Sequence, residues 1–576
     1  SNAASTYTGA TTIKLGTLKL GVSGGATNTP LGTTGAGTSI MSGAVLDFNG
    51  FTVGTAEALT VNGRGINDGG AIVGANVTFA GTIAQATDSR ITNASGTFTI
   101  SGAVSGAFAL YVGGAGNITF SAATGTAGLS LTKQGAGTLT VTGTNTHTGV
   151  TRVDAGTLAY AATTTLAATN LVMNGGTFNN GANADTIGTV TLIGGTITNS
   201  AALTGTAYTF ESGTISGILA GAVAVTKNTN NTVTLSGVNT ISSTITINAG
   251  TLAISGSGSA TAVTGVTVNL GGTLTLDNST TAVADRLNGT GGTNAIIITL
   301  NGGNLNFLGN SAAASSETLG QLALASGHNT VTVTPGAGGS TTLTFASNPG
   351  LNRTAGASVL FRGTSLGATP AANVSTLMFS TAPTLTGASG SANSTTASVI
   401  KGAFGDTSLS GTGSDMVTYN LGNTNGLRLL NSIGFTGEYS GDLQTANANV
   451  KLTADRAAVA TNTNSLILNG FGITNPGGAI TIPMASASLA GNILMNSATN
   501  IAGANTTLGI TTFELNVLTT NTGTISANIG TATTGSLTLS GTGNTTLSAA
   551  NAFTGTTFVN NATLTYGANN ALSSGG

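Results

Sequence analysis

The side chains that most often catalyse reactions or bind transition metals are scarce in this sequence. Its 576 residues include two histidines, His147 and His328, and no cysteine. Nucleophilic catalysis needs a base beside the nucleophile, and zinc or copper sites are built from several His or Cys ligands. We therefore expect a protein that is not an enzyme, with no catalytic centre, no cofactor and no metal site.

Two serines lie in Gly-x-Ser-x-Gly motifs, at residues 21–25 and 363–367. In hydrolases this motif forms a nucleophile elbow, which requires a strand-to-helix turn and a histidine partner. A chain with 89 glycines is expected to contain such matches by chance. We interpret both motifs as chance matches.

Two pairs of carboxylates are close enough in sequence to be considered for glycoside cleavage. They are Asp406 with Asp415, and Glu438 with Asp442. Glycosidases use two carboxyl groups, one as acid and one as base or nucleophile. Acidic residues are sparse in this chain, so we expect these four to be solvated loop charges. A polysaccharide-degrading β-helix is a minor alternative, and no Asp-rich nonapeptide predicts calcium binding.

The charge content excludes several kinds of partner. Only 5% of the residues are charged, the net charge is −2, and no basic stripe is present, which argues against nucleic acid. The longest strongly aliphatic run, residues 295–298, is much shorter than the roughly 20 residues of a membrane helix, so we expect no membrane-spanning segment. The absence of cysteine suits an extracellular bacterial protein.

Strand patterns dominate the chain. Thr and Gly are poor helix formers, and no sustained helical stripe of apolar residues is found. Short runs alternate Thr with an aliphatic residue, as in residues 138–142, 232–236 and 330–334. Such a strand has one apolar face and one hydroxyl-bearing face. The sequence predicts an all-β protein, and the rows of Thr make an ice-binding solenoid a second minor alternative.

The strand openings recur at a nearly constant spacing. Leu139 and Leu158 are 19 residues apart, and Leu235 and Leu252 are 17 apart. A period near 20 residues is typical of a solenoid, in which each coil stacks on the next through parallel ladders. The exposed ends of such a ladder invite pairing with a second copy, end to end or side by side. The motif Gly-Thr-Leu begins at Gly16, Gly137, Gly156, Gly250 and Gly272.

Residues 351–460 differ from the remainder, because they hold 11 of the 30 charged residues and several aromatic ones. We interpret them as irregular coils with longer turns or as a loop-rich excursion, between solenoid stretches at 1–350 and 461–576. Such loops are candidates for recognition of cell-surface glycans or partner cells. The candidate recognition residues are Arg353, Phe361, Arg362, Phe404, Asp406, Tyr419, Arg428 and Tyr439.

Residues 131–158 closely resemble the autotransporter-associated β-strand repeat, also called the passenger-associated transport repeat. The resemblance rests on Lys-x-Gly-x-Gly-Thr-Leu from Lys133, on Asn-Thr-His-Thr-Gly from Asn145, and on Ala-Gly-Thr-Leu from Ala155. His147 stands where this repeat usually has Tyr, so we expect it to pack. Partial or degenerate copies cover residues 5–18, 225–252 and 537–564.

This resemblance implies a right-handed parallel β-helix, export, and an extracellular or outer-surface location on a bacterium. The sequence therefore predicts a non-catalytic structural or adhesive surface protein, a fragment of a larger autotransporter-like passenger that forms a stalk or fibre. The alternative is a glycan- or cell-binding module. The opening Ser1-Asn2-Ala3 is consistent with a tag scar or with native sequence.

Overall fold

The computed structural model describes residues 5–25, 28–161, 166, 169–287, 296–420, 425–432, 434–475, 477–503, 505–530 and 534–572. These residues form 64 short strands and one 3-10 helix, η1 (Ile66–Asp68). The all-β prediction is confirmed. Among the same residues, no helix is long and apolar enough to cross a membrane. The chain divides into two compact units, Ser1–Ser243 and Thr244–Gly576, a boundary that the sequence did not indicate.

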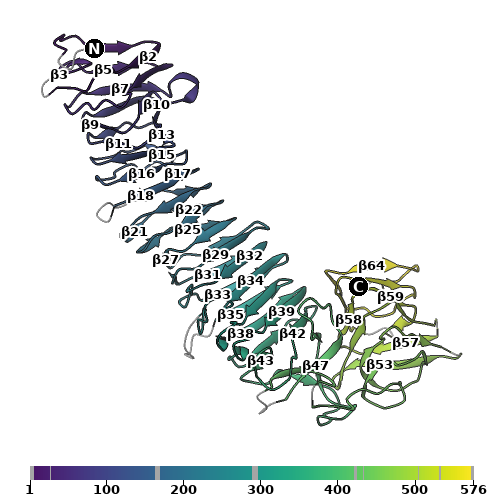
Figure 1. Ribbon diagram of the computed structural model, residues 1–576. Helices are drawn as coiled ribbons and strands as arrows, with labels where there is room; N and C mark the ends of the chain where they lie inside the picture. The colour runs from purple at the N-terminus through teal and green to yellow at the C-terminus, as the bar shows by residue number, and fades with distance from the viewer. Residues whose placement is uncertain are drawn as a thin grey trace. The chain divides into compact units, whose positions relative to one another are not determined.

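The first unit is a stack of parallel coils (Figure 1). One wall contains β13 (Ala109–Gly114), β15 (Ser130–Lys133), β17 (Thr151–Val153) and β19 (Leu171–Met173), each paired in parallel with the next. A second wall contains β14 (Asn117–Phe120), β16 (Thr138–Val141), β18 (Thr157–Tyr160) and β20 (Thr177–Asn179). These ladders confirm the predicted parallel β-helix.

The interior of each coil is a thin apolar layer of aliphatic and some aromatic side chains. Ile118, Leu139, Leu158 and Phe178 are aligned in register from one coil to the next, and all are buried. Residues on either side of them in each strand point outward, because successive side chains of a strand face opposite sides. The Thr–aliphatic alternation therefore sorts hydroxyls to the outside and aliphatic groups to the core.

The second unit begins with the same architecture in longer coils. β34 (Gly272–Asp277), β36 (Asn304–Leu308), β39 (His328–Thr334) and β42 (Ser358–Gly363) form one parallel wall. The step from Leu274 to its partner Leu305 is 31 residues rather than about 20. The extra length lies in the turns, since the paired strands themselves stay short.

An antiparallel meander ends this wall. β42 pairs in parallel with β46 (Ala403–Asp406), which is followed in antiparallel order by β47 (Asp415–Tyr419) and β48 (Leu427–Leu429). A short antiparallel pair, β44 (Leu385–Thr386) and β45 (Val399–Ile400), lies in the same stretch. The predicted less regular stretch in the second half is confirmed, whereas the boundaries at 351 and 460 stay a prediction.

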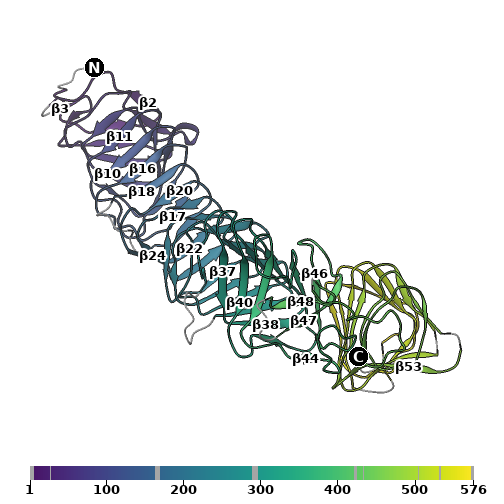
Figure 2. The same ribbon diagram turned by 60° about the horizontal axis from the view of Figure 1, so that its bottom comes forward.

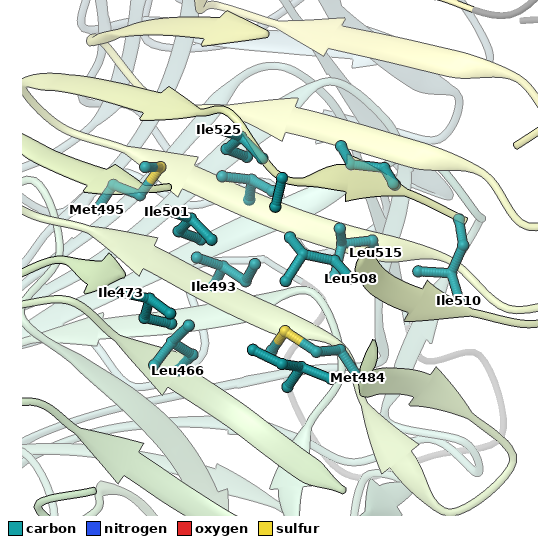
Figure 3. Packing of buried hydrophobic residues seen from close by; sticks show 14 of the residues in the cluster. Leu466, Ile473, Met484, Ile493, Met495, Ile501, Leu508, Ile510, Leu515 and Ile525 are labelled. Atoms are coloured by element: carbon teal, nitrogen blue, oxygen red, sulfur yellow. The ribbon is translucent and has the colours of Figure 1, made fainter. Parts of the chain in front are cut away.

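A further parallel solenoid closes the second unit. Its first wall comprises β49 (Ala448–Lys451), β51 (Thr463–Ile467), β55 (Asn492–Met495), β58 (Leu515–Thr519), β61 (Leu537–Ser540) and β63 (Thr557–Asn560). Figure 2 shows these coils wound around a common axis. Leu466, Ile493, Ile501 and Leu508 point into the space between the walls and form its core (Figure 3).

Candidate functional site

The lysine of the repeat motif fastens two coils together. Lys133 is 1% exposed, and its Nζ donates to the carbonyls of Gln134 (2.7 Å), Gly135 (2.8 Å) and Ala155 (3.1 Å). Burial lowers the pKa of Lys133 to about 8. Gly156 has a φ of +66°, and a Cβ there would lie 2.6 Å from Nζ of Lys133, so this position of the repeat favours glycine.

His147 is fully buried in the segment between β16 and β17. Its Nε2 lies 2.7 Å from Oγ1 of Thr151, and its Nδ1 contacts Oδ1 of Asn145. Burial lowers the pKa of His147 to about 4, so the imidazole is neutral near pH 7. Both ring nitrogens are engaged inside the coil, which is the packing role expected from the sequence.

In the second unit, two solenoid walls pack against each other through their outer faces. Leu360 of β42 and Phe404 of β46 lie on one wall, and Ile467, Leu494 and Leu518 lie on the other. All five are at most 1% exposed, and they form an apolar cluster distinct from the interior of the last solenoid. We call this contact the junction. Met416 and Leu430, from the meander region, complete it.

The strands at the junction are buried on both faces. Every residue of β55 and β58 is buried, whereas β16 alternates buried and half-buried positions. Strands covered on both sides read as nearly continuous apolar runs. The sequence carries a signal of this packing, because Leu494 and Leu518 stand where the regular repeat has an outward Thr, but the Thr–aliphatic alternation alone did not predict it.

Arg353 and Glu514 form an ion pair at the edge of the junction. Nη2 of Arg353 lies 2.5 Å from Oε2 of Glu514, and the two side chains are 14% and 6% exposed. Oε1 of Glu514 also accepts from the backbone N–H of Gly356 (2.8 Å) and from the hydroxyl of Thr538. Burial raises the pKa of Glu514, but the bonds from Arg353 and the other donors outweigh it, so the pKa lies below its usual value.

A second ion pair stabilises the turn after the meander. Arg428 and Glu438 are 1% and 0% exposed and make two parallel bonds, of 2.7 and 2.6 Å. Glu438 also accepts from the backbone N–H of Asn431, and the Arg428 guanidinium lies 3.7 Å from the ring centroid of Phe435. Burial raises the pKa of Glu438, yet the bonds from Arg428 and the backbone lower it more. Such a bidentate pair fixes orientation as well as position.

The candidate recognition residues are mostly internal, which corrects the expectation that they lie on loops. Seven of the eight are on strands, and only Tyr439 is not: Arg353 on β41 (Leu351–Arg353), Phe361 and Arg362 on β42, Phe404 and Asp406 on β46, Tyr419 on β47 and Arg428 on β48. Phe361, Phe404, Asp406, Tyr419 and Arg428 are buried. Many of the charged and aromatic residues that are enriched in this stretch therefore contribute to the junction and the meander. Contact of any of them with a ligand stays a prediction.

The polar groups of Tyr419, Tyr439 and Asp406, three of the candidate recognition residues, form hydrogen bonds within the chain. Tyr419 bonds to the backbone N–H and carbonyl of Phe379, at 3.0 and 2.6 Å, and the Tyr439 hydroxyl accepts from the backbone N–H of Met416. Asp406 accepts from the backbone N–H groups of Ser408 and Gly413, at 2.8 and 2.9 Å.

The carboxylates considered for glycoside cleavage are engaged separately. Asp415 pairs with Lys451 at 2.9 Å, Glu438 pairs with Arg428, and Asp442 accepts from the backbone N–H of Gln444. Ser365, of the second Gly-x-Ser-x-Gly motif, lies in a turn at a φ of 54°, and no α-helix follows it in the described chain. Among the residues with assigned positions, no group of three His, Cys, Asp or Glu side chains is arranged to bind a metal.

One cavity of about 330 Å³ lies beside the Arg353–Glu514 pair. Its lining combines aliphatic side chains, such as Val359 and Ile400, with Arg353 and Lys401. Burial, together with the charge of Arg353, lowers the pKa of Lys401 to about 8, although Glu514 opposes this shift. Nζ of Lys401 lies 5.3 Å from the ring centroid of Phe513. The cavity can hold a small molecule with an apolar body and an acidic group.

Comparison with known proteins identifies the repeats. Four stretches, residues 1–20, 131–159, 225–254 and 535–565, match the family model described as the passenger-associated-transport-repeat. No curated protein and no solved structure matches the chain. The predicted resemblance is confirmed at these four stretches. An autotransporter passenger repeat indicates a protein that is secreted or exposed at the cell surface.

Proposed function

We propose that this chain, with its four passenger-associated transport repeats, is a non-catalytic structural and adhesive segment of a larger autotransporter-like passenger. It forms part of a stalk or fibre on the outer surface of a bacterium. The repeats support the proposal because they indicate a secreted or surface-exposed protein, and the parallel ladders support it as an extended scaffold of backbone hydrogen bonds.

One observation carries the structural role: buried cationic side chains donate hydrogen bonds to backbone carbonyls and so join coils. Lys133 bonds to three carbonyls across two coils. Arg286 is 0% exposed and donates to the carbonyls of Gly258 (2.6 Å), Gly256 (2.9 Å) and Thr281 (2.8 Å). Burying a cation costs free energy unless it is paired or hydrogen-bonded, and each of these two side chains donates to three backbone carbonyls.

The test couples an attachment assay with an activity screen. Beads coated with the chain are compared with albumin-coated beads for attachment to bacterial and epithelial cells, and the soluble chain is incubated with neutral and acidic polysaccharides. Attachment without any release of sugar supports the proposal. Turnover of a polysaccharide would overturn it, and failure to attach would remove the adhesive part.

A glycan-binding module is the second candidate, and the 330 Å³ cavity favours it. Lys401 lines this cavity and makes no hydrogen bond to any residue whose position is described. On a glycan array, binding that weakens in Lys401→Gln and persists in Lys19→Gln would support this function. Lys19 is a suitable control because its side chain is 58% exposed. An array without any signal would eliminate the candidate.

A further inference from the structure

A second cavity of the second unit lies where the wall of β42 meets the last solenoid. It has a volume of about 180 Å³, and its lining is mainly polar. His328 and Arg362 contribute from the first wall, and Thr542 and Asn561 from the facing solenoid. One water molecule takes about 30 Å³ in the liquid, so this space admits a small polar solute.

Arg362 brings an unpaired positive charge to this cavity. Its Nε is buried without a hydrogen-bond partner, and no hydrogen bond of its guanidinium to any described residue is present. Arg353 and Arg428, in contrast, each bind a carboxylate. A buried donor left unpaired costs free energy, and a charged one costs more. The guanidinium therefore has hydrogen-bonding capacity that this chain does not use.

Asp406 influences Arg362 through its charge but does not form an ion pair with it. Asp406 is its partner in the β42–β46 ladder and acts on it through its charge, but the two side chains form no ion pair within 4.0 Å. The Asp406 carboxylate instead accepts from the backbone N–H groups of Ser408 and Gly413, at 2.8 and 2.9 Å. Arg362 remains available to an anionic oxygen from outside the chain.

His328 adds an acceptor at the same place. The Ser358 hydroxyl donates to Oγ of Ser540 at 2.7 Å, so it accepts from Nδ1–H of His328 at 2.9 Å. This assigns the lone pair to Nε2, which has no hydrogen-bond partner among the described residues. Burial and the charge of Arg362 lower the pKa of His328 to about 4, which keeps the ring neutral near pH 7.

We infer that Arg362 and His328 form a binding site for a small anion that also carries a hydroxyl group. Arg362 binds the anionic oxygens, and Nε2 of His328 accepts the hydroxyl proton. A uronic acid residue of a glycan has this chemistry, and so does free hydrogen phosphate. The inference goes beyond the structural role proposed above and does not depend on it.

Isothermal titration calorimetry on the full chain at pH 7 and constant ionic strength tests the site. Glucuronate and phosphate are the probes, sulfate is the anion without a hydroxyl at this pH, and glucose is the hydroxyl compound without charge. We expect one or both probes to bind, sulfate to bind more weakly and glucose not to bind. Binding of glucuronate alone identifies an acidic sugar as the ligand, and binding of phosphate alone identifies the free ion.

Variants separate this site from a general effect of salt. In Arg362→Gln the affinity should fall by roughly tenfold or more, since a charge-assisted hydrogen bond is worth at least one factor of ten. Arg152→Gln, in the other unit, removes the same charge and should bind as the wild type does. His328→Phe should weaken the probes to the level of sulfate, which keeps the test decisive if Arg362→Gln does not fold. Equal affinity in the wild type and the folded site variants, or no binding by the wild type, would overturn the inference.

Discussion

Arg353 and Glu514 are 161 residues apart in the chain, yet their side chains meet in an ion pair of 2.5 Å at the edge of the junction. The pair joins two stretches of parallel solenoid whose strands belong to separate sheets. It also binds the backbone N–H of Gly356, so that one carboxylate holds both a side chain and a turn.

Replacing one member of this pair should loosen the junction. In Glu514→Gln the guanidinium of Arg353, 14% exposed, loses its counter-charge, and we expect a loss of about 2–3 kcal/mol in the stability of the second unit. Hydrogen exchange of β58 peptides in a urea series measures this loss. Arg152→Gln is the control, because it breaks an ion pair in which the Arg152 side chain is 41% exposed. It should change the stability of the first unit by less than about 1 kcal/mol. Equal losses in both variants would contradict the prediction.

Restoring the regular repeat pattern at the junction should be harmful. Leu518→Thr places a hydroxyl in the apolar cluster and removes buried methyl groups, and we expect a loss of about 2–4 kcal/mol. Leu270→Thr is the matched control, since Leu270 is 66% exposed, and it should stay within about 0.5 kcal/mol of the wild type. Urea unfolding followed by hydrogen exchange measures both. An unchanged midpoint for Leu518→Thr would argue against the outer-face packing.

Two aligned asparagines on the junction face should respond in opposite directions. The amide of Asn516 is buried with no partner for its nitrogen or oxygen among the described residues, whereas Asn492 donates to Ile400 O (3.0 Å) and accepts from Gly402 N (2.9 Å). Asn516→Leu should therefore raise the unfolding free energy by about 1–2 kcal/mol, and Asn492→Leu should lower it by a similar or larger amount. Thermal unfolding of the two variants side by side gives the comparison, and a shift of the same sign in both would refute the prediction.

Mild acid should destabilise the first unit through His147. The pKa of this buried ring is about 4 in the folded chain and near 6.5 when unfolded, so the unfolded state takes up the proton first as the pH falls. The stabilisation is complete above pH 6.5 and disappears as the pH falls toward 4, a change of about 3 kcal/mol. His147→Phe, which cannot titrate, should show a shallower loss of stability over this range. Parallel pH profiles for the two proteins would show that another group is responsible.

The sequence predicted the solenoid because each coil repeats the same local chemistry. The alternation around Leu139 and the Gly-Thr-Leu spacing determine the strands, the turns and their register. The junction has no comparable repeat, because it joins residues such as Arg353 and Glu514 that are far apart in the chain. Its only local signature is an aliphatic residue in an outward position, as at Leu494 and Leu518.

The sequence correctly singled out the stretch that contains the candidate recognition residues, but most of these residues are internal rather than exposed on loops. A cluster of charges and aromatics in a low-charge chain marks a departure from the repeat, and the structure has such a departure at the meander. Whether such residues lie on exposed loops or in internal contacts depends on their burial, which the amino-acid composition does not predict. Arg428 and Phe404 therefore have structural roles, whereas the guanidinium of Arg362 has no hydrogen-bond partner among the described residues.

The long sequence separation between junction partners predicts the order in which parts of the chain fold. Neighbouring coils join residues about 20 apart, whereas Asn560 bonds to Gly356 across 204 residues. Long-range contacts of this kind form slowly, because most of the intervening chain must be ordered first. We expect the amides of β58 to gain protection last in pulse-labelled refolding, after those of β16. Until the last coils have folded, the side chains of Leu360 and Phe404 are exposed to water. In a nascent or truncated chain this face is therefore an exposed apolar surface that can aggregate.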